Sequence, residues 1–391
     1  MATNVRSGFG ISEENQLLRE TARNFLDREL PRERIRELDQ AREPVPRDVW
    51  RKMGDLGWHG MLIDERYGGA GDDVSSYAIL LEEIGRHWGS MASDFVLGSM
   101  LCGLLERFGS EEQREALLPG VASGENVVAF SLSEPGGGTD LLRLRTRATL
   151  EDGEWVIRGQ KLYTSAAPQS THICVLARTD EPTDGKLARG LSLILVERQD
   201  AISVRKLKLL GMRSAGTSEV FYDGARAPQD ALLGERGRGF YHLIGSLNRE
   251  RIAAASLSVG LAQAAFDEAL AYAKERTAFD RPIGQFQAIQ HYLADMAIEI
   301  EQTRLLVRKA AWLESEGLPC SMEAAMAKVA GGELAVRATD RGMRILAGHG
   351  MTEDSPMERY LRDSRLQPFS PMSNEMGRNT IGEMLGLPRS Y

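Results

Sequence analysis

The sequence has little cysteine and lacks several common cofactor motifs. Its three cysteines, Cys102, Cys174 and Cys320, lie far apart and form no C-x-x-C pair. This argues against a disulfide framework or a thiolate metal site and favours a reducing compartment. The six histidines are scattered without ligand spacing, so we expect no metal site. No G-x-G-x-x-G follows a predicted strand, and neither a Walker loop nor H-E-x-x-H occurs, so a Rossmann-type nucleotide site is excluded.

An excess of basic charge and long apolar runs are also missing. Lys and Arg number 48 against 56 Asp and Glu, which gives a formal net charge of −8. Nucleic-acid binding surfaces are usually basic, so this balance argues against a nucleic-acid partner. No apolar run approaches the roughly 18 residues of a membrane span, and Met1–Gly10 lacks the apolar core of a signal peptide. We therefore expect no membrane association and a cytoplasmic location.

The pattern of apolar residues divides the 391-residue chain into three predicted domains. Residues 1–124 are mostly helical, with an apolar stripe at three- and four-residue spacing formed by Leu17, Leu18, Ala22, Phe25, Leu26 and Leu30. Residues 125–240 contain short β-rich runs between turn residues, at Val127–Leu132, Trp155–Ile157, Ile173–Leu176, Leu191–Val196 and Val220–Tyr222. These runs predict a small antiparallel barrel or sandwich.

Helical patterning returns in the third domain, residues 241–391. The residues Phe286, Ile289, Leu293, Met296 and Ile300 step by three and four, which predicts a seam for helix packing. The small residues Ala253, Ala254, Ala255 and Gly260 would let another helix approach closely. The sequence therefore predicts an α+β protein with a β domain between two helical domains.

Three segments carry residue types suited to a flat, phosphorylated cofactor. In Phe130–Asp140, consecutive glycines let the backbone approach a ligand, and hydroxyl side chains add hydrogen-bonding groups. In Gly159–Ser165, an aromatic side chain beside two hydroxyls suits stacking at an isoalloxazine edge. In Arg276–Gln287, an arginine near a helix end suits bidentate contact with a pyrophosphate. Taken alone, the first segment is also compatible with an ordinary turn, and the second and third fit an ordinary strand and a salt-bridged loop better than a cofactor site.

Taken together, these segments occur in a recognisable order along most of the chain. Ser133–Asp140 is similar to T-E-P-x-A-G-S-D, Lys161–Ala166 to K-x-W-I-T-N, and Arg276–Phe279 to R-x-x-F-G, with Asp280 in place of the glycine. Phe286-Gln287 is similar to F-Q, Leu293–Met296 to L-A-D-M, and Met357–Asp363 to a segment that contains E-R-x-x-R-D. By these elements and their spacing, the chain resembles the acyl-CoA dehydrogenases.

The resemblance implies a helical N-terminal domain, a middle antiparallel β domain and a C-terminal four-helix bundle, with FAD between the last two. The implied FAD contacts within one subunit are Phe130, Leu132, Ser133, Gly138, Thr139, Tyr163, Thr164, Ser165, Ser373 and Glu375. Arg276, Phe279 and Gln287 would reach the FAD of another subunit, which implies a homodimer or homotetramer. Arg344 and Gly348 are further implied FAD contacts. Arg344 stands where the family has glutamine. Thr139, Asn248 and Arg251 are the implied substrate contacts.

The residue that would remove the α proton of a thioester is not where many family members carry it. Their glutamate aligns with Pro371, which has neither a carboxylate nor a backbone N–H. The neighbouring Ser370 and Met372 are poor bases. Other family members carry a glutamate at the position of Glu250, and we predict Glu250 as the base. The alternative is that Glu250 is a helix-surface carboxylate paired with an arginine.

The resemblance implies FAD-dependent α,β-dehydrogenation of an acyl thioester, on CoA or on a carrier protein, with an electron-transfer flavoprotein or similar acceptor. The reverse reduction is a variant of the same chemistry. Two alternatives remain at this point. One is an oxygen-using flavin oxidase or monooxygenase on the same fold, and the other is a non-catalytic flavoprotein scaffold.

Overall fold

The computed structural model describes residues 11–389, so the prediction about Met1–Gly10 lies outside the described residues. The N-terminal helices are α1 (Glu13–Glu29), α2 (Arg32–Ala41), α3 (Arg47–Asp55), α4 (Val74–His87), α5 (Gly89–Phe108) and α6 (Glu111–Ala122). Most of the predicted stripe on α1 faces the core, but Leu17 is 65% exposed and is a wrong prediction. It lies beyond the edge of the buried face, which Ala22, Phe25 and Leu26 form.

An eight-stranded sheet follows, in the order β6-β7-β3-β2-β4-β5-β8 with β1 beside β4. Its strands are β1 (Val128–Ser131), β2 (Arg147–Glu151), β3 (Glu154–Thr164), β4 (His172–Arg178), β5 (Leu191–Glu197), β6 (Ile202–Lys206), β7 (Ser218–Pro228) and β8 (Leu232–Leu233). The prediction of a middle β domain is confirmed. Most pairs are antiparallel, but β1 and β2 each pair with β4 in parallel, so the sheet is mixed.

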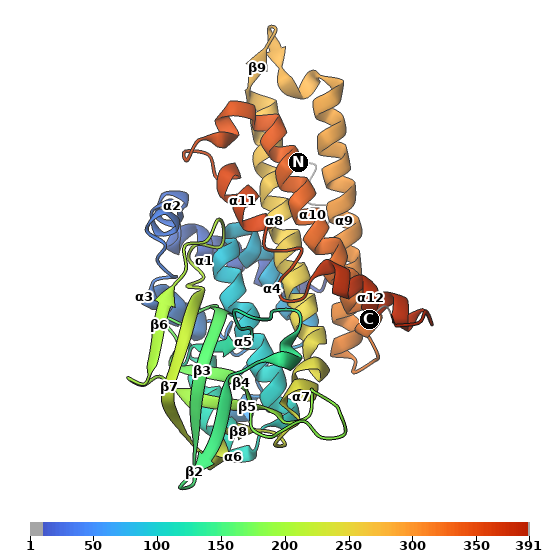
Figure 1. Ribbon diagram of the computed structural model, residues 1–391. Coiled ribbons are helices and arrows are strands. Elements are labelled where there is room, and N and C mark those ends of the chain that lie inside the picture. The colour runs from blue at the N-terminus through green and yellow to red at the C-terminus, as the bar shows by residue number, and fades with distance from the viewer. Residues whose placement is uncertain (1–10, 390–391) are drawn as a thin grey trace.

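The C-terminal part is helical, and its longest helices extend beyond the sheet (Figure 1). They are α7 (Gly239–Gly245), α8 (Leu247–Glu275), α9 (Gln287–Ser315), α10 (Ser321–Leu346), α11 (Met357–Ser364) and α12 (Asn374–Met384), with the hairpin of β9 (Thr277–Ala278) and β10 (Arg281–Pro282) after α8. The predicted seam on α9 turns inward, with Met296 and Ile300 buried. The predicted boundary at residue 240 falls inside α7. Within residues 11–389, no helix is long and apolar enough to cross a membrane.

Helices α4 and α8 touch through glycine, as the small residues of α8 predict. A Cβ built on Gly260 would lie 2.1 Å from the Glu82 carbonyl oxygen, and one on Gly85 would lie 2.8 Å from the Leu257 carbonyl oxygen. Only a residue without a side chain permits this approach. The contact attaches the N-terminal helices to the helix that carries Glu250.

Replacing Gly260 should therefore destabilise the protein strongly. Gly260→Leu forces α4 and α8 apart, and we expect a loss of about 2 to 4 kcal/mol, since the clash is with backbone. The matched control is Gly98→Ala in α5, where an added Cβ meets nothing within 4 Å. That substitution should be neutral or slightly stabilising because alanine favours helices. Thermal unfolding of both variants checks the prediction, which equal melting temperatures would contradict.

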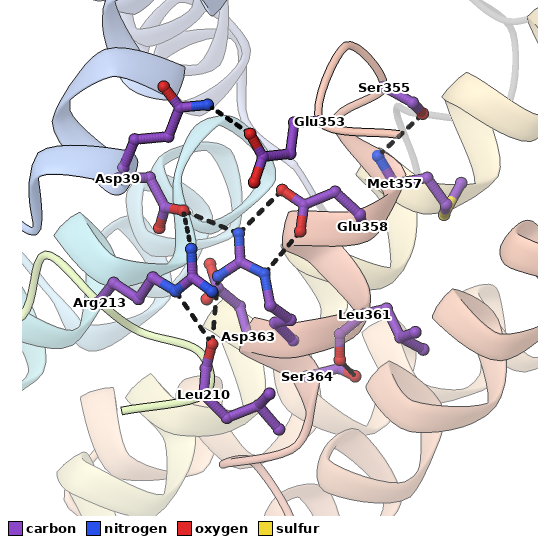
Figure 2. Close-up of polar contacts among 12 residues, drawn as sticks. Asp39, Leu210, Arg213, Glu353, Ser355, Met357, Glu358, Leu361, Asp363 and Ser364 are labelled. Carbon is purple, nitrogen blue, oxygen red and sulfur yellow. Dashed lines mark hydrogen bonds and ion pairs between the residues drawn. The ribbon is translucent and has the colours of Figure 1, made fainter. Parts of the chain in front are cut away.

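A polar junction joins all three parts of the chain (Figure 2). The Arg362 guanidinium on α11 donates to the Asp39 carboxylate of α2 at 2.7 Å and to the Leu210 carbonyl before β7 at 3.3 Å. The Met212 N–H donates to the buried Asp363 carboxylate at 2.5 Å. Burial, together with the nearby Asp39 charge, raises the pKa of Asp363 to about 6. This junction holds the segment before β7 and the end of α11 against the N-terminal helices.

Candidate active site

A buried ion pair holds the loop after β1 against β3. The Lys161 ammonium is fully buried, lies 3.1 Å from the Glu134 carboxylate and donates to the Leu132 carbonyl at 2.9 Å. The Glu134 carboxylate also accepts from the backbone N–H groups of Arg145 and Thr146, at 2.7 and 2.9 Å. Burial lowers the pKa of Lys161 to about 8, and the adjacent Glu134 charge limits that decrease. These contacts fix both ends of the glycine-rich loop.

The outer surface of this loop is open. A Cβ built on Gly136 or Gly138 would meet nothing within 4 Å, and Thr139 is exposed beside a half-buried Ser133. At the end of β3, Tyr163 has a φ of 62°, in the left-handed region, and its ring is 63% exposed. An exposed ring beside an open glycine backbone is a suitable surface for a flat ligand with phosphates.

Two of the predicted cofactor residues lie behind this surface. The side chains of Phe130 and Thr164 are buried, and the Thr164 hydroxyl is 2.9 Å from the Ser131 hydroxyl. Ser165 is half-buried, with its hydroxyl 2.9 Å from that of Thr217. Phe130 and Thr164 therefore support the loop from the core, while Ser165 lies at its edge.

A second group of predicted cofactor residues lies at the other end of the long helices. Its exposed members are Arg276, Phe279, Gln287, Arg344 and Gly348. The hairpin of β9 and β10 projects from this end, away from the sheet (Figure 1). Phe279 at its tip has a φ of 52° and is 88% exposed. The hairpin therefore lies away from the sheet, whose strands β1 and β3 lead into the first group of predicted cofactor residues (Figure 1).

The Glu250 carboxylate is buried near the start of α8 without an ion pair. Its side chain is 6% exposed, and no residue within 11–389 donates a hydrogen bond to it or places a cation within 4.0 Å. Burial raises the pKa of Glu250 to about 7, and the charge of Arg251 limits that increase. The arginine that forms ion pairs in this turn of α8 is instead the half-buried Arg249, which pairs with Glu106 and Glu314. The alternative interpretation of Glu250 as a paired surface carboxylate is therefore wrong.

The segment before α12 lies next to Glu250 and Arg251. The Arg251 guanidinium is buried, and its Nη2 is 3.7 Å from the sulfur of Met372. Its Nε has no hydrogen-bond partner within the described residues. Asn248, one turn earlier, donates to the Ser321 hydroxyl at 3.2 Å. All three predicted residues of the α8 N-terminus are thus close together, with Pro371 exposed beside them.

A buried lysine that sequence reasoning missed positions this segment. The Lys328 ammonium on α10 donates to the Asn374 side-chain oxygen at 2.8 Å and to the Pro368 carbonyl at 3.2 Å. Burial lowers the pKa of Lys328 to about 8, against the nearby charge of Glu375. Ser373 caps α12 by accepting from a backbone N–H, and Glu375 is exposed in its first turn. Lys328 therefore ties together the two ends of the segment that carries Met372.

Two signals in the sequence would have identified the buried lysines. Lys328 is the only charge in the Ala- and Gly-rich run Ala324–Gly332. Lys161 occupies a position in β3 where the alternation of the strand predicts an inward side chain. A charge at such a position requires a buried partner. The partners themselves, Glu134 and Asn374, come from distant segments and are visible only in the fold.

The arrangement around β1 and β3 fits FAD. The open backbone at Gly136 and Gly138 leaves room for phosphates and a ring, and the exposed ring of Tyr163 offers a stacking surface. Hydroxyls of Ser133, Thr139 and Ser165 add hydrogen-bonding groups. For metal ions, the part of the chain between residues 11 and 389 holds no group of three or more His, Cys, Asp or Glu side chains arranged as ligands.

The sequence matches three acyl-CoA dehydrogenase domains in order. Residues 12–125 match the N-terminal domain, residues 129–225 the middle domain and residues 237–386 the C-terminal domain. The probable acyl-CoA dehydrogenase YngJ of Bacillus subtilis is 36% identical, over 96% of this chain and 99% of that protein. The human mitochondrial short-chain specific acyl-CoA dehydrogenase is also 36% identical, over 97% of this chain and 92% of that protein.

Solved structures agree with the sequence comparison. Butyryl-CoA dehydrogenase from Megasphaera elsdenii superposes with a TM-score of 0.91 at 29% identity, covering 96% of this chain and 98% of that one. A glutaryl-coenzyme A dehydrogenase in complex with glutaryl-CoA gives a TM-score of 0.91 at 32% identity, covering 97% of each chain. The resemblance read from the sequence is confirmed, and the chain belongs to the acyl-CoA dehydrogenase family of FAD-dependent flavoprotein oxidoreductases.

Proposed function

We propose that the chain oxidises an acyl-CoA between its α and β carbons and that Glu250 removes the α proton. The buried, unpaired carboxylate of Glu250 supports this role. A base works best when its pKa lies near the working pH, and burial brings the pKa of Glu250 to about 7. Pro371 and Met372, at the alternative position for the base, offer no carboxylate.

FAD, when bound, accepts the two electrons that leave the acyl chain. In the proposed site, the loop from Phe130 to Thr139 and the end of β3 at Tyr163–Ser165 hold this cofactor. Leu132, Ser133 and Gly138 present backbone and hydroxyl groups on its open side. Ser373 and Glu375 approach from the start of α12. The Lys161–Glu134 pair keeps the loop in the shape that this contact needs.

A second copy of the chain completes the cofactor site in this proposal. Arg276, Phe279 and Gln287 lie in or beside the hairpin of β9 and β10, which projects away from the sheet, and Arg344 and Gly348 lie at the end of α10 and just after it (Figure 1). The 88% exposure of Phe279 leaves its ring free for a neighbouring subunit. A homodimer is therefore the minimum assembly, and we propose a homotetramer that works in the cytoplasm and passes electrons to an electron-transfer flavoprotein.

The relatives reported above favour dehydrogenation over the two other candidate functions. Their names describe acyl-CoA dehydrogenases, and none of them supports the oxygen-using or the non-catalytic alternative. CoA is the proposed carrier of the acyl group for the same reason. Asn248 and Arg251, at the start of α8, and Thr139, on the glycine loop, are the proposed substrate contacts.

The visible spectrum of the purified protein tests the function directly. Anaerobic addition of a series of acyl-CoAs should bleach the flavin band with at least one of them, and air should restore the colour slowly. Rapid turnover with oxygen and release of peroxide would instead indicate an oxidase. A protein that purifies without colour, or that no acyl-CoA bleaches, would contradict the proposal.

The pH dependence of the rate tests the base. Glu250 removes a proton only when ionised, so kcat/KM should fall about tenfold per pH unit below a pKa of about 7 and level off above it. Steady-state rates between pH 5.5 and 9 with a fixed acceptor check this, and the stability of the flavin spectrum at each pH is the control. A profile that stays flat below pH 7 would exclude Glu250 as the base.

A further inference from the structure

A cavity of about 190 Å³ lies between α2 and the segment that leads into α11. Asp39 and Glu358, which belong to the polar junction of Figure 2, form part of its wall, together with Arg213 before β7. The volume is below the roughly 300–1,000 Å³ of sites for drug-sized ligands, so the cavity suits a small molecule. None of its lining residues is among the predicted cofactor or substrate contacts.

One buried cation in this cavity lacks an ionic partner. Arg359, in the first turn of α11, is 5% exposed, and within residues 11–389 its guanidinium forms no hydrogen bond and no ion pair. It lies over the Tyr360 ring, 5.4 Å from the ring centroid. The other arginines of the cavity wall each form an ion pair, and these are Arg32, Arg36 and Arg213. A buried charge without a counter-charge is costly, so an anion in the cavity would stabilise Arg359.

The same cavity contains carboxylate oxygens that no cation contacts. Asp39 is 3% exposed, and its Oδ2 accepts from Arg362 at 2.7 Å, but its buried Oδ1 has no hydrogen-bond partner within the described residues. The Glu353 carboxylate accepts from the neutral Gln40 amide at 2.9 Å and, in the described part of the chain, forms no ion pair. The cavity therefore needs positive charge at these oxygens as well as negative charge at the guanidinium.

We propose that this cavity binds an amino acid, whose carboxylate pairs with Arg359 and whose ammonium group is held by Asp39 and Glu353. A guanidinium donates two parallel N–H bonds to a carboxylate. An ammonium group has three donors and no acceptor, which suits the Asp39 Oδ1 and the Glu353 carboxylate. An anion alone would leave these oxygens without a donor and add negative charge beside them. An amine alone would leave Arg359 unpaired, so a ligand with both charges fits best.

Thermal unfolding of the full-length, FAD-loaded protein tests this binding site. Each common amino acid is added at about 2 mM, and sodium chloride of the same ionic strength is the reference. At least one amino acid should raise the melting temperature by about 2 °C or more, because a ligand that joins α2 to α11 binds the folded state alone. Butyrate and butylammonium, which carry one charge each, should raise it by less.

Variants then locate the bound amino acid. In calorimetric titrations, Arg359→Met should weaken the binding of the best amino acid about 10- to 100-fold, through the loss of a charge-assisted pair. Glu353→Gln changes an exposed carboxylate, so the fold is kept, and binding should weaken about two- to fivefold. Arg158→Met on β3 is the matched control and should bind as the wild type does. If Arg359→Met does not fold, Arg359→Lys takes its place, because lysine keeps the charge but cannot form the two parallel bonds.

Three results would overturn the proposal. In the first, no amino acid raises the melting temperature above that of the salt reference. In the second, butyrate raises it as much as the best amino acid does, which would make the cavity a site for simple anions. In the third, the substitutions at Arg359 and Glu353 leave the affinity unchanged, which would place the ligand elsewhere. Binding is measured without an acyl-CoA, so the outcome is independent of the proposed dehydrogenation.

Discussion

Glu250→Gln should reduce kcat by about 10³-fold or more while the protein stays folded and yellow. Glutamine has nearly the same volume as glutamate but cannot accept the α proton, so only the proton transfer is lost. Anaerobic mixing with an acyl-CoA that bleaches the wild-type flavin should leave the variant coloured. The matched control is Glu268→Gln on the same helix, which removes a half-buried carboxylate paired with Arg32 at 2.9 Å. The control should bleach at the wild-type rate.

The same variant should also be more stable than the wild type above neutral pH. The folded protein raises the pKa of Glu250 from 4.5 to about 7, so the folded state binds the proton more tightly than the unfolded chain. The ionised form is therefore disfavoured in the fold, and the wild type loses stability as pH rises from about 4.5 to 7. At pH 8 we expect Glu250→Gln to be more stable by up to about 3 kcal/mol. The difference should shrink toward pH 5.

Together these two readouts test one structural claim. A carboxylate that is buried without a partner increases the rate of proton removal but lowers the free energy of unfolding. Active-site residues often favour activity at the expense of stability in this way. If Glu250→Gln loses activity but its stability relative to the wild type does not depend on pH, then Glu250 is not the buried, unpaired group that the structure describes. If activity is unchanged, Glu250 is not the base.

Lys161→Met should weaken FAD binding by at least about tenfold and destabilise the fold. Removing one member of a buried ion pair leaves the other charge uncompensated, at a cost of about 3 to 5 kcal/mol. Here the remaining charge is Glu134, whose side chain is 9% exposed and which holds the glycine-rich loop. Retention of flavin through gel filtration and the temperature of unfolding are the measurements. Arg158→Met on the same strand, which removes an exposed pair with Glu151, should change stability by less than about 0.5 kcal/mol.

A double variant tests whether Lys161 acts through its charge or through the packing of its side chain. Glu134→Gln combined with Lys161→Met removes both charges, so it should be more stable than Lys161→Met alone. The glutamine can still accept from the backbone N–H groups of Arg145 and Thr146. We therefore expect part of the FAD affinity to return. A double variant as unstable as the sum of the two single variants would mean that Lys161 acts through packing rather than through its charge.

The sequence alone predicted the fold well because its signals are local. Apolar residues such as Phe286, Met296 and Ile300 recur at helical spacing, which predicts that one face of α9 packs inward. The turn residues between the β-rich runs mark where the strands begin and end. The short strands β2, β6 and β8 were missed. Residues such as Arg147–Glu151 are mostly exposed and carry little apolar pattern, so only their pairing in the sheet reveals them.

The sequence by itself determined the family, the cofactor and the candidate base, because the family motifs are short segments that can be recognised by their residues and by their order along the chain. Glu250, Pro371 and the glycine loop were all identified there. Only the tertiary structure decided that Glu250 is buried and unpaired, that Arg249 takes the ion pairs with Glu106 and Glu314, and that Arg251 Nε has no hydrogen-bond partner within the described residues. Consecutive residues on a helix point in directions about 100° apart, so their surroundings come from other segments. Burial and pairing between distant segments are properties of the packed fold, and no local pattern encodes them.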